Sequence, residues 1–264
     1  MADSDVVVGH SDTEILVNVA GYVIHLERSA GRRPQALELA RTLPVPARIL
    51  PAVDGRTLDE ATRRRFVRRR IHAPRYPFPL LDAEVGCFLS YRRAWQAILD
   101  EGCDAGLIVE DDVAPASPDF VDVIMAAAAT IQPHEYIRFP LHERADRGPT
   151  ARTAGGVTLC EPRLPGLGMQ MQLVGREAAR LLLAATEVFD RPVDSFVQMQ
   201  WLHGACVLAA LPVVIREIDF LLGGTVIQIK RGGIVHKAMH EFHRPILRFA
   251  VRVANERWRR RHAA

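Results

Sequence analysis

Three consecutive carboxylates end an apolar run between Ala105 and Val113, where the sequence reads AGLIVEDDV. Adjacent like charges repel one another, and each acid favours its neutral form unless a cation lies between them. Because side chains alternate along a strand, we expect Glu110 and Asp112 to point one way and Asp111 the other. An acid-x-acid pair at a strand end suits Mg²⁺ or Mn²⁺, hard cations that keep waters and bridge phosphates. The alternative is a strand that ends in a well-hydrated turn.

Another carboxylate lies where a buried face is expected. Glu84 belongs to a helical stripe that is otherwise apolar and aromatic; its other members are Phe88, Tyr91 and Trp95. A buried carboxylate costs free energy unless it is paired or has a chemical role. An acid in the first turn of a helix is also stabilised by the helix dipole. A chemical role and a structural role for Glu84 therefore both stay open.

The elements that must position these acids alternate between strands and helices in the first half of the chain. Apolar, β-branched runs predict strands at 17–26, 47–53, 106–109 and 135–140. The spacing of apolar residues predicts helices at 34–42, 58–70, 82–101 and 119–129. This alternation is typical of an α/β fold with a mostly parallel central sheet flanked by helices. Ligands of such sheets bind beyond the carboxyl ends of the strands, where the three acids are expected.

The second half of the chain has weaker signals. The segment 141–165 is expected to be loop-rich. Beyond it we predict a strand at 168–174, a helix at 176–187, one further helix at 193–202 and a pair of strands within 207–218. No internal repeat is present. We therefore interpret the chain as a single domain, residues 1–235, followed by a basic helical tail, residues 236–264.

The composition is that of an ordinary soluble protein. The 264 residues are 48% hydrophobic and 25% charged, with a net charge of +3. The chain has no run of about 18 apolar residues, and its first residues lack the basic and apolar segments of a secretory signal. We therefore expect a cytoplasmic protein. The cysteines have neither metal-binding nor disulfide spacing, which agrees with reduced thiols at Cys87, Cys103, Cys160 and Cys206.

Arginine is concentrated in two clusters, Arg63–Arg70 and Arg257–Arg261. Such clusters can bind nucleic acid, but they are also common on hydrated helix faces. The chain has no recognised nucleic-acid-binding module and no platform of stacking aromatic residues. We therefore expect no nucleic-acid partner.

The stretch 240–264 has the pattern of a basic amphipathic helix. Its apolar face consists of Leu247, Ala250, Val251, Ala254 and Trp258. A helix of this kind can lie on an anionic membrane surface, which would make the protein peripheral to the inner face of the membrane. The apolar face can equally pack on the domain, and both interpretations stay open.

Five segments, taken together and in order, resemble glycosyltransferase family 25. They are VIHLERSAGRR, PAVDGRTL, DAEVGCFLSYRRAW, LIVEDDV and PVDSFVQMQW. The family includes bacterial lipooligosaccharide galactosyltransferases and collagen galactosyltransferases. The resemblance covers about Tyr22–Trp201. It implies a GT-A-like fold and an inverting transfer of a sugar from a nucleotide donor, commonly UDP-galactose, to a glycan or lipid-linked glycan acceptor.

The resemblance also implies roles for the acids of the strand end. Glu110 and Asp112 would hold Mn²⁺ or Mg²⁺ against the departing diphosphate, because the charge that develops there needs a cation. Asp111 would hydrogen-bond the donor. Arg28 and Arg32 would face the nucleotide, since a guanidinium can pair with phosphate or stack on a base. The alternative for both arginines is a hydrated loop.

The chain departs from the family pattern at two positions. The family's Asn in the first block is His25, and its Ser-His pair is Ser90 followed by Tyr91. We still expect His25 and Ser90 to contact the donor. Asp54 is expected either to contact the nucleotide or to act only as a turn residue before glycine. The two departures keep open an alternative function, a catalytically impaired binding or regulatory protein of the same fold.

Inversion in one displacement needs a general base that takes the proton of the acceptor hydroxyl. Asp194 is the first candidate, because it follows Pro192 in the half of the chain that is expected to face the acceptor. It is also expected at the N-cap of a helix that begins at Ser195, a role that would explain it without chemistry. Glu84 is the second candidate.

Overall fold

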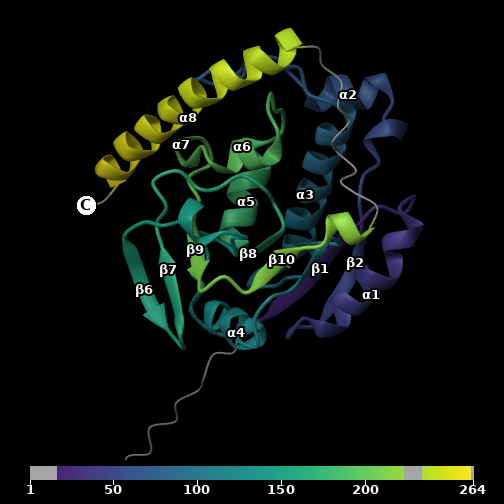
Figure 1. Cartoon of the computed structure of the whole chain (residues 1–264), viewed down its shortest axis with the longest axis vertical. Coiled ribbons are helices and arrows are strands. Elements are labelled where there is room, and N and C mark those ends of the chain that lie inside the picture. The colour runs from purple at the N-terminus through teal and green to yellow at the C-terminus, as the bar shows by residue number, and fades with distance from the viewer. Residues whose placement is uncertain (1–16, 223–233, 263–264) are drawn as a thin grey trace, which may run out of the picture.

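The computed structural model describes residues 17–222 and 234–262 (Figure 1). The strands span Val19–His25 (β1), Ala47–Pro51 (β2), Ala105–Glu110 (β3), Val113–Pro115 (β4), Glu135–Arg138 (β5), Thr150–Ala154 (β6), Val157–Cys160 (β7), Met171–Gly175 (β8), Cys206–Leu211 (β9) and Ile215–Glu217 (β10). The α-helices span Arg33–Thr42 (α1), Glu60–Phe66 (α2), Asp82–Asp100 (α3), Phe120–Thr130 (α4), Arg176–Ala185 (α5), Val193–Val197 (α6), Gln200–His203 (α7) and Ile234–His262 (α8). Short 3₁₀ turns cover Ala30–Arg32, Gly55–Thr57, Glu143–Ala145 and Asp219–Leu222.

The main sheet has eight strands in the order β2-β1-β3-β8-β5-β9-β7-β6. Strands β1, β2 and β3 are parallel to one another, and so are β5 and β9. β8 is antiparallel to both β3 and β5, and β7 is antiparallel to both β9 and β6. Within the main sheet, the strands other than β8 and β7 therefore run in the same direction. The predicted α/β class with a mostly parallel, helix-flanked sheet is confirmed.

Helices cover both faces of the sheet, so its central strands are apolar on both sides. Tyr22 of β1 packs with Trp95 of α3 and Leu182 of α5 on one face. Val23, the next residue of β1, packs with Ile124 of α4 on the other face, which α1 also covers. Figure 1 shows α4 and α1 on the side away from α3 and α5. This alternation is the reason for the nearly continuous apolar runs of the strands.

The acidic strand end is held by a second, two-stranded sheet. β3 ends at Glu110, and a turn leads into β4. β4 pairs antiparallel with β10, and Val113 lies opposite Glu217 in this pair. The N–H of Ile218 donates a hydrogen bond to the backbone carbonyl of Asp112 at 2.8 Å. The β4–β10 pair thus sets the direction in which the chain leaves the three acids.

Helix α8 lies across α6 and α7 (Figure 1). Val251 is 3% exposed, and Arg259 Nη2 donates to the carbonyl of Pro162 at 2.7 Å. No residue of the predicted apolar face is exposed, so this face packs on the domain and does not stand free for a membrane. Within the described residues, no helix combines the length and the apolarity needed to cross a membrane.

The segment 141–165 contains a hairpin, which the sequence did not predict. β6 and β7 pair antiparallel, and β7 joins the main sheet beside β9. β6 is the last strand of the sheet, and Thr150 and Arg152 belong to its mostly exposed, polar sequence. An edge strand of this kind lacks the apolar alternation that reveals a strand in sequence, and the prediction was wrong for that reason.

The single helix predicted at 193–202 is in fact two helices, α6 and α7, with a break around Gln198. Asn255 of α8 occupies the break. Its Nδ2 donates to the carbonyl of Gln198 at 2.7 Å, and its Oδ1 accepts from the N–H of Gln200 at 3.2 Å. The break is therefore stabilised by a contact from the other end of the chain.

Two further boundaries differ from the prediction. α2 ends at Phe66 and does not reach Arg70, because Val67 takes extended backbone and forms a β-bridge with Phe189. The strand pair predicted within 207–218 is present, but β9 and β10 belong to different sheets.

Candidate functional site

A cavity of about 820 Å³ opens beyond the carboxyl ends of β1 and β3. Its lining includes most of the residues that the sequence singled out, namely Arg28, Arg32, Asp54, Glu84, Ser90, Glu110, Asp111, Asp112 and Asp194. His25 is not part of the lining. It is 2% exposed, and its Nδ1 lies 2.7 Å from Asp111 Oδ2, so it can act on the cavity only through that carboxylate.

The acids at the end of β3 share one guanidinium. Arg32 Nη1 donates to Asp111 Oδ1 and to Asp112 Oδ2, at 3.2 Å in both cases. The expectation that Asp111 and Asp112 point in opposite directions is therefore wrong. Strand geometry ends at Glu110, and in the turn that follows both carboxylates face Arg32. The guanidinium group of Arg32, in the loop that follows β1, thus holds the acidic turn in place.

Burial, and then the close grouping of like charges, shifts the pKa values of these acids. Loss of hydration, reinforced by the charge of Asp112, raises the pKa of Glu110 to about 8. Burial and the neighbouring Asp111 raise the pKa of Asp112 to about 6, while Arg32 acts in the opposite direction. The hydroxyl of Tyr91 donates to Glu110 Oε1 at 3.0 Å and favours the charged form of Glu110. A cation between Glu110 and Asp112 would relieve this repulsion.

The donor atoms fit such a cation in part. Asp112 Oδ1 is buried and has no hydrogen-bond partner, whereas Asp112 Oδ2 accepts from Arg32. In residues 17–222 and 234–262, no group of three or more His, Cys, Asp or Glu side chains has the arrangement of a metal site. Glu110 and Asp112 therefore offer two carboxylates, and water or ligand phosphates must supply the other oxygens. Mg²⁺ and Mn²⁺ are commonly bound in this way.

The turn after β2 is fixed by close contact with α3. A Cβ atom on Gly86 would lie 2.6 Å from the carbonyl oxygen of Val53, so only glycine allows this approach. Ser90 Oγ accepts from the N–H of Val53 at 2.8 Å. Asp54 Oδ2 accepts from Arg28 Nε at 2.6 Å, and Oδ1 of Asp54 accepts from a backbone N–H in its own turn. Ser90 and Asp54 therefore have structural partners and also line the cavity.

The two candidate bases lie in the same cavity. Glu84 Oε2 accepts from the N–H of Leu81 at 2.7 Å, so the helix-end role of Glu84 is confirmed. Burial raises the pKa of Glu84, and the charge of Asp194 raises it further. Asp194 accepts from the N–H groups of Gly168 at 3.2 Å and Ser195 at 2.6 Å. The predicted N-cap position of Asp194 is wrong, because α6 begins at Val193, two residues before the predicted start at Ser195, and Pro192 is its N-cap.

Cys87 of α3 connects the two ends of the cavity. Loss of hydration raises the pKa of the Cys87 thiol well above its usual value, and the charges of Glu110, Asp194 and Glu84 add to the effect. The acidic turn and the candidate bases are thus both close to one position on α3, within one continuous cavity.

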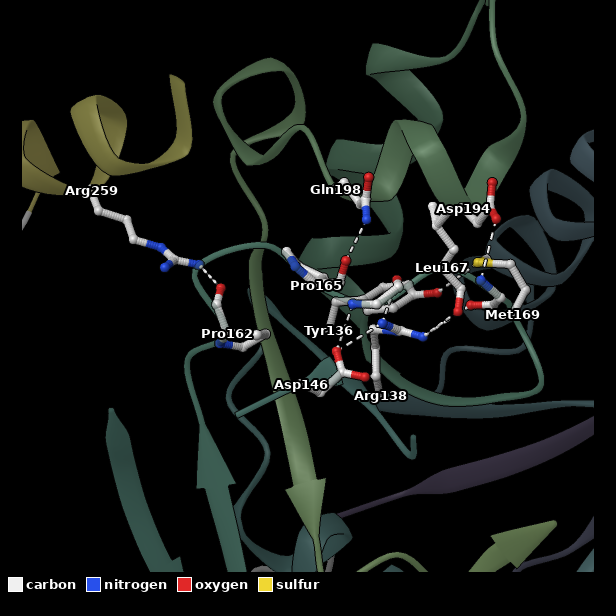
Figure 2. A network of polar contacts seen from close by, with 12 residues as sticks. Tyr136, Arg138, Asp146, Pro162, Pro165, Leu167, Met169, Asp194, Gln198 and Arg259 are labelled. Carbon is white, nitrogen blue, oxygen red and sulfur yellow. Dashed lines mark hydrogen bonds and ion pairs between the residues drawn. The ribbon is translucent and has the colours of Figure 1, made fainter. Parts of the chain in front are cut away.

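The loop between β7 and β8 forms another wall and is held by a buried ion pair (Figure 2). Arg138 Nη1 lies 2.9 Å from Asp146 Oδ1, with the two side chains 6% and 2% exposed. Arg138 Nη2 donates to the carbonyls of Leu167 at 3.3 Å and Gly168 at 3.1 Å. Sequence reasoning assigned no role to Arg138. An arginine inside a buried strand needs a partner, and that requirement was the available signal.

The same loop reaches Asp194. The N–H of Gly168 donates to Asp194. The side chain of Gln198 donates to the carbonyl of Pro165 (Figure 2). The Arg138–Asp146 pair therefore supports the loop that in turn contacts a candidate base.

Further cavity residues were not predicted. Tyr76 and Phe78 come from a proline-rich connection before α3, and their rings meet edge to face at 5.6 Å between centroids. Glu217 comes from β10, and Arg244 and Arg248 come from α8. No local sequence pattern placed these residues in the lining of the cavity.

The fold and this cavity define an α/β protein with a candidate ligand site at the carboxyl edge of its sheet. Residues 19–146 match the model of "Glycosyltransferase family 25 (LPS biosynthesis protein)". This part, just under half of the chain, is similar to glycosyltransferase family 25, which confirms the resemblance predicted from the sequence.

Curated relatives match over a shorter stretch. Procollagen galactosyltransferase 2 of Mus musculus is 30% identical over 95 residues, which are 35% of this chain and 15% of that protein. Procollagen galactosyltransferase 1 of Danio rerio is 30% identical over 95 residues, 35% of this chain and 16% of that protein. "Inactive glycosyltransferase 25 family member 3" of Mus musculus is 32% identical over 95 residues, with the same two shares. The matched region thus spans about one sixth of these relatives.

Proposed function

We propose that the protein is a glycosyltransferase that transfers a sugar from a nucleotide donor to a glycan acceptor with inversion. One observation carries the proposal. A single cavity holds a cluster of carboxylates at the end of β3 and, separately, the two candidate bases Glu84 and Asp194. Displacement of a diphosphate by a hydroxyl needs charge neutralisation at the leaving group and a base at the acceptor.

The acidic turn would form the donor end of the cavity. Glu110 and Asp112 are the residues that would hold Mg²⁺ or Mn²⁺, and when bound the cation supplies charge neutralisation for the diphosphate. Arg32 holds Asp111 and Asp112 in place. Arg28 is bound to Asp54 at the rim and presents its remaining N–H groups to the nucleotide.

The acceptor hydroxyl would bind at the other end. Its oxygen bonds to the anomeric carbon of the donor sugar as the bond from that carbon to the diphosphate oxygen breaks. The proton of the hydroxyl passes to Asp194, whose orientation is set by the N–H groups of Gly168 and Ser195. Glu84 is the second candidate for this proton.

The two departures from the family pattern have partners in the acidic cluster. His25 is hydrogen-bonded to Asp111, and Tyr91 donates to Glu110. Both substituted residues therefore support the acids, which favours an active enzyme. We take UDP-galactose as the first donor to test, because two relatives are named galactosyltransferases, and lipooligosaccharide or another cell-surface glycan as the acceptor class.

The test is calorimetric titration of the protein with UDP-galactose, with and without Mn²⁺, followed by an assay for released UDP. We expect binding that Mn²⁺ strengthens at least tenfold, and slow hydrolysis of the donor. If UDP-galactose and a panel of other nucleotide sugars fail to bind in the presence of either Mn²⁺ or Mg²⁺, the proposal is wrong.

The alternative of an impaired binding protein has one supporting observation, the similarity to a relative named inactive. Binding of a nucleotide sugar with no hydrolysis and no transfer to any glycan would favour this alternative. Turnover that depends on Asp112 would exclude it.

We also propose a cytoplasmic location with attachment to an anionic membrane. The predicted apolar face of α8 is covered, but Ile246 and Phe249 are 56% and 69% exposed, and Arg252 beside them is also exposed. An apolar pair among arginines suits a membrane interface. Cosedimentation with anionic vesicles should fall severalfold in a variant with Ile246→Ser and Phe249→Ser. Unchanged cosedimentation would exclude attachment through α8.

A further inference from the structure

Helix α8 supplies two arginines to the cavity wall that differ from the other arginines there. Arg28, Arg32 and Arg191 are each bound to an aspartate at 3.2 Å or less. Arg244 and Arg248 also line the cavity and are exposed, but neither has a salt bridge to any residue that the structure describes. They are four residues apart on one helix, so their guanidinium groups project from the same face.

These arginines belong to the end of the cavity that holds the candidate bases. Burial raises the pKa of Tyr76, the charges of Glu84 and Asp194 raise it further, and Arg244 acts in the opposite direction. Arg244, Glu84 and Asp194 therefore all act on Tyr76 and line the same cavity, while the acidic turn already has Arg32. The positive charge on α8 thus faces the acceptor side of the cavity.

The aromatic pair Tyr76 and Phe78 completes this end. Both side chains are half-buried and line the cavity. Their rings pack edge to face, with 5.6 Å between the centroids. The two rings offer apolar faces and Tyr76 adds a hydroxyl, a combination that suits packing against a sugar ring.

We infer that this end binds an acceptor sugar that carries an anionic group, either phosphate or carboxylate, with the anion held by Arg244 and Arg248. The inference rests on the proposed function and adds the class of acceptor. Guanidinium groups pair with phosphate and carboxylate through two parallel hydrogen bonds. The carboxylates of Glu84 and Asp194 repel an anion, so the charged group lies toward α8 and a neutral hydroxyl of the same sugar lies toward the acids. A neutral acceptor would leave both arginines without a counter-charge.

The experiment compares three probes by NMR or calorimetric titration of the full chain saturated with UDP and Mn²⁺. The probes are D-glucose 6-phosphate, D-glucuronate and D-glucose, so the source of the negative charge is distinguished. We expect at least one anionic sugar to bind about tenfold or more tightly than glucose. The variant with Arg244→Gln and Arg248→Gln should lose this preference. Arg260→Gln, which removes an exposed charge of α8 that does not line the cavity, should keep it.

Two results would overturn the inference. One is equal binding of anionic and neutral sugars to the unaltered protein. The other is a preference that survives in the double variant, because the anion would then bind elsewhere. Thermal melting of the double variant checks that it folds. UDP-galactose hydrolysis by the unaltered protein, measured in parallel, separates the two proposals. Hydrolysis without an anion preference would contradict only the inference about the acceptor. Absence of donor binding would contradict the proposed function.

Discussion

The two ends of the cavity are built in different ways. The donor end comes from four segments that follow one another between His25 and Asp112, and its charges are paired there with Arg32 and Arg28. The acceptor end combines the connection before α3, the β7–β8 loop, α6 and α8, which are up to about 170 positions apart in sequence. Short sequence motifs supply the residues of the first end, whereas the residues of the second end come mostly from segments without such motifs. Substitutions at the two ends should therefore affect different measured properties of the protein.

The largest effect is expected at the donor end. Asp112→Asn removes one of the two candidate metal ligands and should lower donor turnover about 10²–10³-fold, because charge neutralisation at the leaving group is lost. Steady-state assays of UDP release at several Mn²⁺ concentrations measure this. Asp122→Asn, at an exposed position outside the cavity, is the matched control. A loss of donor turnover of less than threefold for Asp112→Asn would contradict the assignment of the acidic turn as the donor end.

The next effect concerns the support of the acceptor wall. Arg138→Met leaves Asp146 buried without its partner and frees the carbonyls of the β7–β8 loop. We expect a loss of about 3–5 kcal/mol in the free energy of unfolding, measured by urea denaturation. Arg147→Met breaks an exposed Arg–Glu pair and should cost under about 1 kcal/mol. Equal losses in the two variants would contradict a supporting role for the buried pair.

Loss of the general base is expected to impair the acceptor end of the cavity and to spare the donor end. Asp194→Asn should lower the rate of transfer to an acceptor about 10²-fold and leave donor affinity within about threefold, because the proton acceptor is lost at one end only. Separate kcat and KM values for donor and acceptor measure this. Glu84→Gln serves as the comparison. If Glu84→Gln has the larger effect on transfer, the assignment of the base must be exchanged.

The smallest expected effect is at the contact between α8 and the helix break. Asn255→Ala leaves the carbonyl of Gln198 and the N–H of Gln200 buried without a partner. We expect a loss of about 2 kcal/mol in the free energy of unfolding, a few degrees in the melting midpoint. Glu256→Ala, beside it on the surface side, should change little. A neutral Asn255→Ala would show that α8 contributes little to the acceptor end.

The sequence predicted the donor half of the fold well for a physical reason. β1, β2, β3, α1 and α3 are long, strongly periodic elements, and they were found within a few residues of their observed bounds. The acids were expected at the carboxyl edge of the sheet because parallel strands end there together. The family resemblance, and not strand geometry, implied that Arg28 and Arg32 face the nucleotide. The orientation of Asp111 was predicted wrongly because strand alternation does not extend into a turn.

By itself, the amino-acid sequence determined the α/β class, the order of the first strands and helices, and the acids that lie at the end of β3. Each of these depends on periodicity or spacing within some twenty residues. The tertiary structure alone decided that Asn255 stabilises the break between α6 and α7, that Arg138 and Asp146 support the β7–β8 loop, and that Arg244 and Arg248 reach the cavity. These contacts depend on how distant segments pack, because buried polar groups take whichever partner the fold brings within reach.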